Sequence, residues 1–104
     1  MKNGMYVAWT TVGSEAEAAV LASLLVEEGL AACVQIDGPV RSFYRWRGKT
    51  ESATECRLWI KCTVERIGAV EARVREAHPY EVPQWVALLA DRVDPEYARW
   101  AHGE

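Results

Sequence analysis

The sequence has no hydrophobic run that approaches the roughly 18 residues of a membrane-spanning helix. Met1-Lys2-Asn3-Gly4 leads directly into a strand-like pattern, which is not how a secretion signal begins. The cysteines are odd in number and lack the paired spacing of a disulfide framework; they are Cys33, Cys56 and Cys62. We therefore expect free thiols, no membrane association and a cytoplasmic location.

Several short functional motifs are also missing. No CxxC, HExxH or EF-hand spacing occurs, and no Gly-rich phosphate loop, paired-carboxylate arrangement or nucleophile-base pair is present. The aromatic, glycine-rich strand motif of RNA-binding modules is absent, and the net charge is −3. We expect a protein that is not an enzyme, binds no nucleic acid and uses no organic cofactor.

What the sequence does have is an uneven distribution of charge. Positions 41–61 hold six basic residues against two acidic ones, although the chain as a whole is acidic. Such a segment could meet an anion or an acidic neighbouring chain. A solvated hairpin, whose charges discourage edge-to-edge aggregation, explains the same pattern.

Hydrophobic periodicity predicts secondary structure in the order β-α-β-β-α-β, followed by a short helix. Ser14 and Glu17 form a capping box, Gly29 fits a helix C-terminus, and Thr63 is placed to cap the second helix. The predicted strand segments are 5–11, 30–36, 40–46, 50–63 and 85–90, where the order counts 30–36 and 40–46 as one strand. The predicted helices are 15–28, 64–77 and a short one that opens at Pro95. Asp37-Gly38-Pro39 predicts a turn or bulge, and Arg47-Gly48-Lys49 a hairpin connection.

This order is typical of an α+β, ferredoxin-like split β-α-β fold, formed here as one domain over residues 1–104. Helices in that fold cover one face of the sheet, so the other face must be polar, covered by a ligand or buried in an oligomer. Trp59 alternates with charged residues on that face, and the chain has five tryptophans in all. Since one small core cannot bury all of them, we expect an oligomer.

The segment His78-Pro79-Tyr80-Glu81-Val82-Pro83, called the proline loop below, places an imidazole, a phenol and a carboxylate within six residues. Each proline fixes its own φ and pushes the preceding residue toward extended geometry. The polar side chains are thus presented by a stiff segment. A binding surface and a simple proline stop after a helix are both consistent with it.

Several stretches resemble, in order, the CutA family of divalent-cation-tolerance proteins. They are Leu30-Ala31-Ala32-Cys33, Ser42-x-Tyr44-x-Trp46-x-Gly48-Lys49, Glu55 with Ile60-Lys61, the proline loop, and Tyr97 with Trp100. The resemblance implies a homotrimer of ferredoxin-like protomers in which long hairpins extend the sheets of neighbouring subunits. It also implies that the protein binds a divalent metal, copper before zinc, and acts in cation tolerance or in the response to metal ions.

For metal binding we expect His78 to offer an accessible imidazole, Glu81 to assist it, and Cys33 to be the next donor. His78 as a helix C-cap and Cys33 as a packed thiol are the alternatives. Thr10 stands where some bacterial members of the family carry a first-strand cysteine proposed as a copper ligand. A copper site in this chain cannot use that thiol.

If the predicted hairpin and the proline loop converge at a subunit boundary, they form a cleft with acidic, basic and aromatic walls. The residues expected there are Tyr44, Trp46, Glu55, Lys61 and Tyr80. Trimer packing by the aromatic residues, and an ion pair between Glu55 and Lys61, are the alternatives. A second hypothesis is a trimeric signalling module like the PII regulators, with a small anion bound in the subunit clefts. The physiological small-molecule or protein partner is not evident from the sequence.

Overall fold

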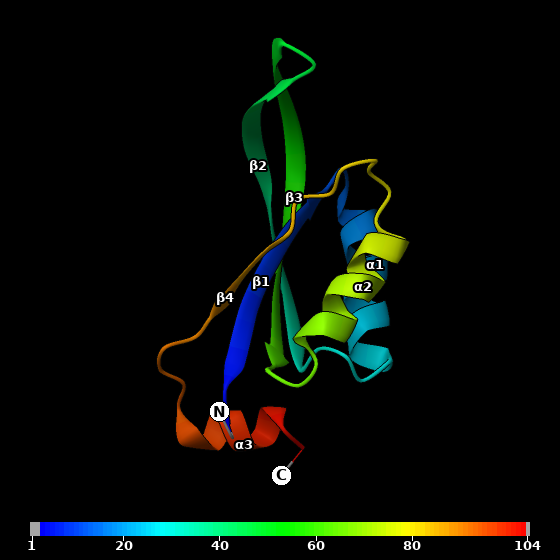
Figure 1. Cartoon of the computed structure of the whole chain (residues 1–104). Helices are drawn as coiled ribbons and strands as arrows, with labels where there is room; N and C mark the ends of the chain where they lie inside the picture. Colours follow the sequence, from blue (N-terminus) through cyan, green and yellow to red (C-terminus); the bar gives the residue numbers. More distant parts are fainter. Residues whose placement is uncertain (1–2, 104) are drawn as a thin grey trace.

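One antiparallel sheet of four strands carries two helices side by side on one face (Figure 1). This computed structural model describes residues 3–103. The elements are β1 (Met5–Val12), α1 (Glu15–Glu27), β2 (Cys33–Trp46), β3 (Lys49–Thr63), α2 (Ile67–Ala77), β4 (Val86–Leu89) and α3 (Pro95–Ala101). The strands lie in the order β2-β3-β1-β4, with all three pairs antiparallel. The predicted α+β, ferredoxin-like arrangement is confirmed.

The hydrophobic core lies between the sheet and the two helices. The alternation predicted for the long third strand is confirmed, since Leu58, Ile60 and Cys62 are fully buried while Trp59, between them, is only half-buried. Leu25 of α1 and Val74 of α2 complete this core from the helix side. The buried side chains that alternate along the strands thus pack against those that recur at helical spacing on α1 and α2, in one hydrophobic layer.

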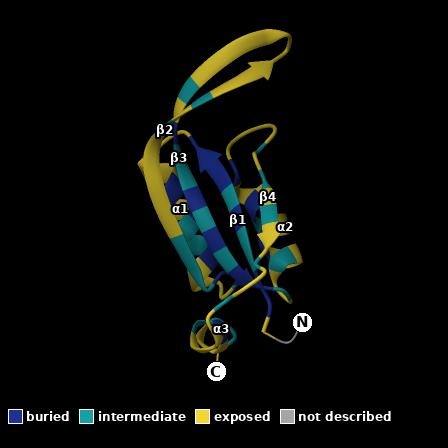
Figure 2. Cartoon of the chain, turned by 90° about the vertical axis from the view of Figure 1, so that its left-hand side faces the viewer, coloured by how far each residue is buried: buried dark blue, intermediate teal, exposed yellow. Residues whose placement is uncertain are grey.

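The β2–β3 hairpin extends well beyond the rest of the sheet (Figure 1). β1 pairs with β3 only from Cys56 to Thr63, so β3 residues 49–55 pair with β2 alone. We call residues 40–46 and 49–55 the distal arm. Most of the arm is solvent-exposed (Figure 2), whereas at the base of the hairpin β3 lies between β1 and β2.

A β-bulge and a tight turn shape this hairpin. The register shifts between Asp37 and Val40, so the strands predicted at 30–36 and 40–46 are one bulged strand. Gly38 has φ +145°, and a Cβ there would lie 3.1 Å from the Glu55 carbonyl oxygen, which explains why the bulge needs glycine. At the tip, Arg47 and Gly48 both have positive φ, as a two-residue hairpin turn requires.

Three boundary predictions are wrong. α2 begins at Ile67 with Arg66 as its N-cap residue and no side-chain cap, because residues 64–66 form a turn in which the Val64 N–H donates to the Gly4 carbonyl oxygen. β4 has only four residues, since its partner β1 pairs with it over four positions. The strand predicted over 30–36 begins only at Cys33, because the backbone N–H groups of Leu30 and Ala31 donate to the Leu25 carbonyl oxygen in the turn after α1. Within residues 3–103, no helix is both long enough and apolar enough to cross a membrane.

Candidate functional site: an aromatic cleft with a buried carboxylate

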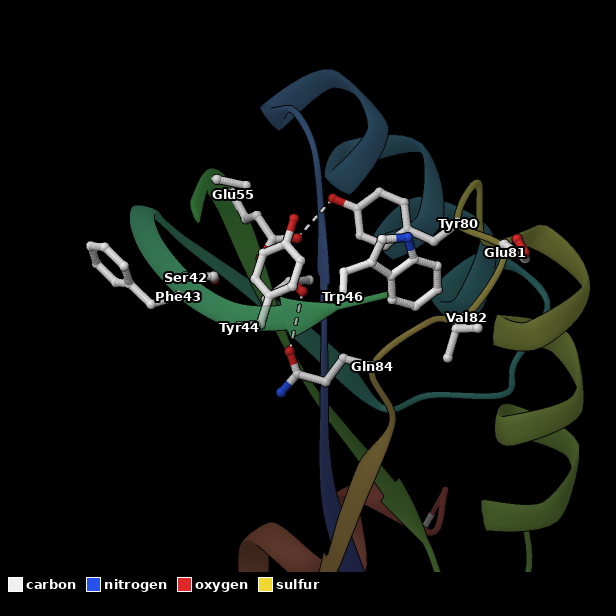
Figure 3. Close-up of a pocket in the computed structure, with 11 residues that line it drawn as sticks. Ser42, Phe43, Tyr44, Trp46, Glu55, Tyr80, Glu81, Val82 and Gln84 are labelled. Atoms are coloured by element: carbon white, nitrogen blue, oxygen red, sulfur yellow. Dashed lines mark hydrogen bonds between the residues drawn. The ribbon is translucent and has the colours of Figure 1, made fainter. Parts of the chain in front are cut away.

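A cleft of about 720 Å³ lies where the distal arm, the end of β1 and the proline loop meet (Figure 3). Of the residues predicted to form it, Tyr44, Trp46, Glu55 and Tyr80 do line it. The hairpin and the proline loop therefore converge within one chain.

Lys61 is not part of the cleft, and the prediction that placed it there is wrong. Its ammonium group donates to Gln35 Oε1 at 2.7 Å and lies 6.0 Å from the centre of the Tyr97 ring. Six positions along an extended strand separate it from Glu55, which corresponds to roughly 20 Å. An ion pair between Glu55 and Lys61 is therefore absent.

Glu55 forms the acidic wall of the cleft. It pairs with Val40, the β2 residue just beyond the bulge, and is only 8% exposed. The Tyr80 hydroxyl donates to Glu55 Oε2 at 2.7 Å. Burial, followed by the hydrogen bond to this carboxylate, raises the pKa of Tyr80. The phenol thus remains protonated near neutral pH and serves as a constant donor to the carboxylate.

The charged side chains that line the cleft are both acidic, Glu55 and Glu81. Arg47 lies at the rim, where its guanidinium is 3.5 Å from Glu81 and 5.3 Å from the centre of the Trp46 ring. Glu55, by contrast, is a largely buried carboxylate that forms no ion pair with a Lys, Arg or His among residues 3–103.

Aromatic side chains make up much of the remaining surface. Figure 3 shows Tyr44, Trp46 and Tyr80 on the cavity side together with Glu55, while Phe43 points away. Tyr44 and Trp46 are 44% and 39% exposed, so their rings are open to a ligand. The arrangement combines one buried carboxylate with three aromatic rings.

Three polar residues that line the cleft were missed by sequence reasoning, namely Thr11, Gln84 and Ser42, although Ser42 lies in the hairpin stretch that carries the resemblance. Thr11, at the end of β1, donates its hydroxyl proton to Gln84 Oε1 at 3.1 Å. Gln84 directly follows the proline loop, so its position beside Pro83 was the available signal. Thr11 carried no local signal, because its place in the cleft depends on a partner 73 positions away.

His78 is buried, and the expectation of an accessible imidazole is wrong. Its Nδ1 accepts a hydrogen bond from the Tyr80 backbone N–H at 3.1 Å, which leaves the ring proton on Nε2. Nε2 lies 3.0 Å from Thr10 Oγ1 and 2.9 Å from the Thr11 carbonyl oxygen. Burial lowers the pKa of His78, so the neutral ring fastens the proline loop to β1.

The three expected metal ligands do not come together in one chain. Glu81 is exposed and faces Arg47. Cys33 pairs in register with Lys61, toward the end of the sheet opposite the Thr10–Thr11 end that holds His78. In the part of the chain that the structure describes, no group of three or more His, Cys, Asp or Glu residues could hold a metal ion. A single protomer therefore does not fit the expected metal site.

Fold and cleft together define a ferredoxin-like α+β domain with an extended hairpin. Residues 6–104 match the family described as CutA1 divalent ion tolerance protein, and the chain belongs to this family. The resemblance noted in the sequence is thus confirmed.

Curated relatives agree with this assignment. The divalent-cation tolerance protein CutA of Thermus thermophilus is 42% identical over 90 residues, covering 86% of this chain and 87% of that protein. The CutA homolog of Xenopus laevis is 35% identical over 96% of this chain, and mouse CutA is 37% identical over 91%. The chain spans only 66% and 54% of the length of these two animal proteins.

Solved structures of the family have the same fold. The Thermus thermophilus divalent cation tolerance protein superposes with a TM-score of 0.89 at 40% identity, covering 93% of this chain and 94% of that one. The protein described as the periplasmic divalent cation tolerance protein CutA of Archaeoglobus fulgidus gives 0.91 at 34% identity, covering 95% and 96%.

Proposed function

We propose that this chain acts in divalent-cation tolerance as a cytoplasmic homotrimer that binds divalent metal and catalyses no reaction. Membership of the CutA1 family supports the role in tolerance. The three cysteines are free thiols, the state that a reducing compartment maintains. The proposed homotrimer is supported mainly by the exposure of apolar side chains on the distal arm.

An isolated two-stranded hairpin is at best marginally stable in water. The arm nevertheless projects beyond its own sheet and exposes large apolar side chains, with Phe43 69% exposed. The strands at the two edges of the sheet, β2 and β4, are also different from each other. If β2 of one copy contacts β4 of the next, the copies associate head to tail. Such an assembly stops growing only when it closes into a ring, and a trimer is a closed ring of three copies.

Sedimentation equilibrium tests the assembly. We expect a mass three times the 11.7 kDa of the chain at micromolar concentration, and a shift toward the monomer in Trp46→Ala. Val20→Ala is the matched control, because Val20 is an exposed apolar residue on α1 outside the arm. A monomeric wild type, or equal masses for the two variants, would contradict the proposed assembly.

The proposed metal site uses ligands from more than one copy, since one chain offers no suitable group within residues 3–103. Cys33 is its first candidate, because it is partly accessible and begins an edge strand of the sheet. Copper is preferred over zinc by thiolate and nitrogen ligands. Glu81 can contribute a carboxylate, whereas His78 would first have to give up its hydrogen bonds.

Copper titration of the wild type, Cys33→Ala and Cys62→Ala tests this site. Cys62 is the matched control, because it is fully buried and burial raises the pKa of its thiol to about 11. We expect Cys33→Ala to weaken copper binding and Cys62→Ala to leave it unchanged. Unchanged binding in Cys33→Ala would remove Cys33 from the proposed site.

The second hypothesis, a PII-like module that binds a small anion, gains no support from this cleft. The basic residues of the hairpin do not line it, and its two charged lining residues are carboxylates. An anion placed there would be repelled by Glu55 and Glu81.

A further inference from the structure

α1 exposes apolar side chains where a surface helix normally carries charge. Its charged residues lie only toward its two ends, and none occurs between Glu17 and Glu27. Val20, in this uncharged stretch, is 69% exposed. The neighbouring α2 has the usual amphipathic pattern, since it buries Val70 and Val74 and carries four charged residues among its eleven. The apolar outer surface of α1 is therefore not explained by packing within the protomer.

This surface borders an open groove of about 290 Å³, called the α1 groove below. Ala16, Val20 and Leu24, which are spaced four residues apart on α1, line it together with Ala77 of α2 and Pro79 of the proline loop. The volume is just below the range of small-molecule sites, so it suits the side chains of a docked segment. Within residues 3–103, no residue of the distal arm, β2 or β4 lines the groove, so it does not include the surfaces that the proposed trimer uses.

Both ends of the apolar stretch are acidic. α1 holds Glu15 and Glu17 in its first turn, ends at Glu27 and has no basic residue, and all three glutamates are exposed. None of the three forms a salt bridge within residues 3–103, whereas Glu28, the C-cap residue, pairs with Arg73. From Glu17 to Glu27 the chain advances ten positions, which corresponds to about 15 Å along the helix. A partner that covers the stretch thus meets negative charge at both ends.

A second copy of this chain does not suit the surface. Pairing α1 with another α1, in either direction, places glutamates opposite glutamates, and like charges repel. The same glutamates repel an anionic lipid surface. A partner with basic residues at both ends of an apolar stripe has the complementary charge.

We infer that the α1 groove binds an amphipathic helix of a partner protein. The apolar stripe of that helix packs against Val20 and into the groove, which is a common mode of helix recognition. Its lysine or arginine residues pair with Glu17 at one end and with Glu27 at the other. The basic residues of the partner are therefore about ten positions apart, matching the spacing of the glutamates.

Three synthetic peptides of equal length test the charge and the pattern of the partner. The first is a helix with leucines at i, i+3, i+4 and i+7 and lysines about ten positions apart at the two ends. The second has glutamates in place of the lysines. The third keeps the composition of the first but distributes the leucines around the helix.

Fluorescence anisotropy of the labelled peptides with the wild-type protein in its native assembly measures their affinities. The first peptide should bind at least about tenfold tighter than either of the others, because it alone combines an apolar stripe with opposite charge. Its affinity should fall as salt is added. No binding of the first peptide, or equal binding of the first peptide and either of the others, would overturn the inference.

Two variants locate the apolar contact. Val20→Gln should weaken binding of the lysine peptide about tenfold, because a polar side chain replaces the exposed apolar anchor. Val26→Gln is the matched control, since Val26 is 44% exposed on the same helix but does not line the groove. It should leave the affinity unchanged. Equal affinities in the two variants would overturn the assignment to the α1 groove.

A second pair of variants tests the charge contact independently of the apolar one. Glu17→Gln removes the charge but keeps a side chain that suits the capping box with Ser14, so the helix start is retained. We expect the affinity of the lysine peptide to fall about threefold, with a weaker dependence on salt. Glu96→Gln makes the same change at an exposed residue in the first turn of α3 and should have no effect. Equal affinities and equal salt dependence in these variants would overturn the proposed charge pairing.

Discussion

The base and the distal arm of the β2–β3 hairpin differ in the contacts that stabilise them. At the base, β3 lies between β1 and β2 and under the helices, so Leu58 and Ile60 are fully buried. In the distal arm the same two strands pair only with each other, and Phe43 is 69% exposed. The base is stabilised by its own chain. The arm has apolar side chains that its own chain does not cover, which is typical of a protein–protein interaction surface.

The cleft lies at the junction of these two halves. Glu55 is the β3 residue directly beyond the bulge, and the proline loop reaches it through Tyr80. His78 anchors that loop to the base through Thr10 and Thr11. A rigid base thus positions the loop, while the arm supplies the exposed aromatic walls.

The largest expected effect comes from substitution at the base. Leu58→Ala should reduce the free energy of unfolding by about 2–5 kcal/mol, because it leaves a cavity in a fully buried position. Phe43→Ala in the arm should change it by less than about 0.5 kcal/mol in protein diluted until it is monomeric. Urea unfolding of both variants measures the difference. Similar losses would show that the arm is part of the protomer core.

Next in size is a contrast between assembly and folding. Trp46→Ala should weaken self-association by about 2 kcal/mol, since large aromatic side chains dominate interfaces. His78→Ala should leave self-association nearly unchanged but lower protomer stability, because it removes the hydrogen bonds that hold the proline loop. Sedimentation and thermal melting separate these effects. Equal shifts in both measurements for both variants would contradict the division between arm and base.

A smaller effect is expected at the junction. Tyr80→Phe removes the donor to Glu55, so we expect a loss of about 1–3 kcal/mol in unfolding free energy. The folded pKa of Tyr80 is raised above its ordinary value of 10.0, so the folded state retains this proton to higher pH than the unfolded chain. Wild-type stability should therefore decline above about pH 10, and less so in Tyr80→Phe. Identical alkaline profiles would contradict this role.

The smallest effect is an acid dependence due to His78. Its folded pKa lies below the ordinary value of 6.5, mainly because of burial, so the folded state binds fewer protons than the unfolded chain. This contribution to stability is present above about pH 6.5 and is lost as pH falls through the folded pKa. NMR titration of the His78 ring should give a pKa below 6.5. A value at or above 6.5 would show that the imidazole is accessible.

Local patterns predicted the fold well because period-2 and helical burial are properties of neighbouring residues. The capping box at Ser14, the bulge at Gly38 and the turn at Gly48 are all local features that the structure contains. The start of α2 was mispredicted because the Val64 backbone N–H pairs with the Gly4 carbonyl oxygen, which leaves residues 64–66 in a turn. That pairing is a tertiary interaction, which local propensity does not encode.

For the cleft, the resemblance to the CutA family indicated which aromatic and acidic residues form it. Their spacing in the sequence alone could not show that they lie close together. The burial of His78 could not be predicted, because its partners Thr10 and Thr11 are 68 and 67 positions away. That Glu55 and Lys61 form no ion pair was equally hidden, since it depends on where Lys61 lies in the folded sheet.

Hydrogen exchange along the β2–β3 hairpin tests most directly whether other copies hold the distal arm. We expect amides at 40–46 and 49–55 to be protected at high protein concentration and to lose that protection on dilution. Amides at 58–62, in the base, should stay protected throughout, because β1 pairs with that part of β3. Arm amides that exchange freely at every concentration, or that remain protected in the diluted monomer, would contradict the proposed assembly.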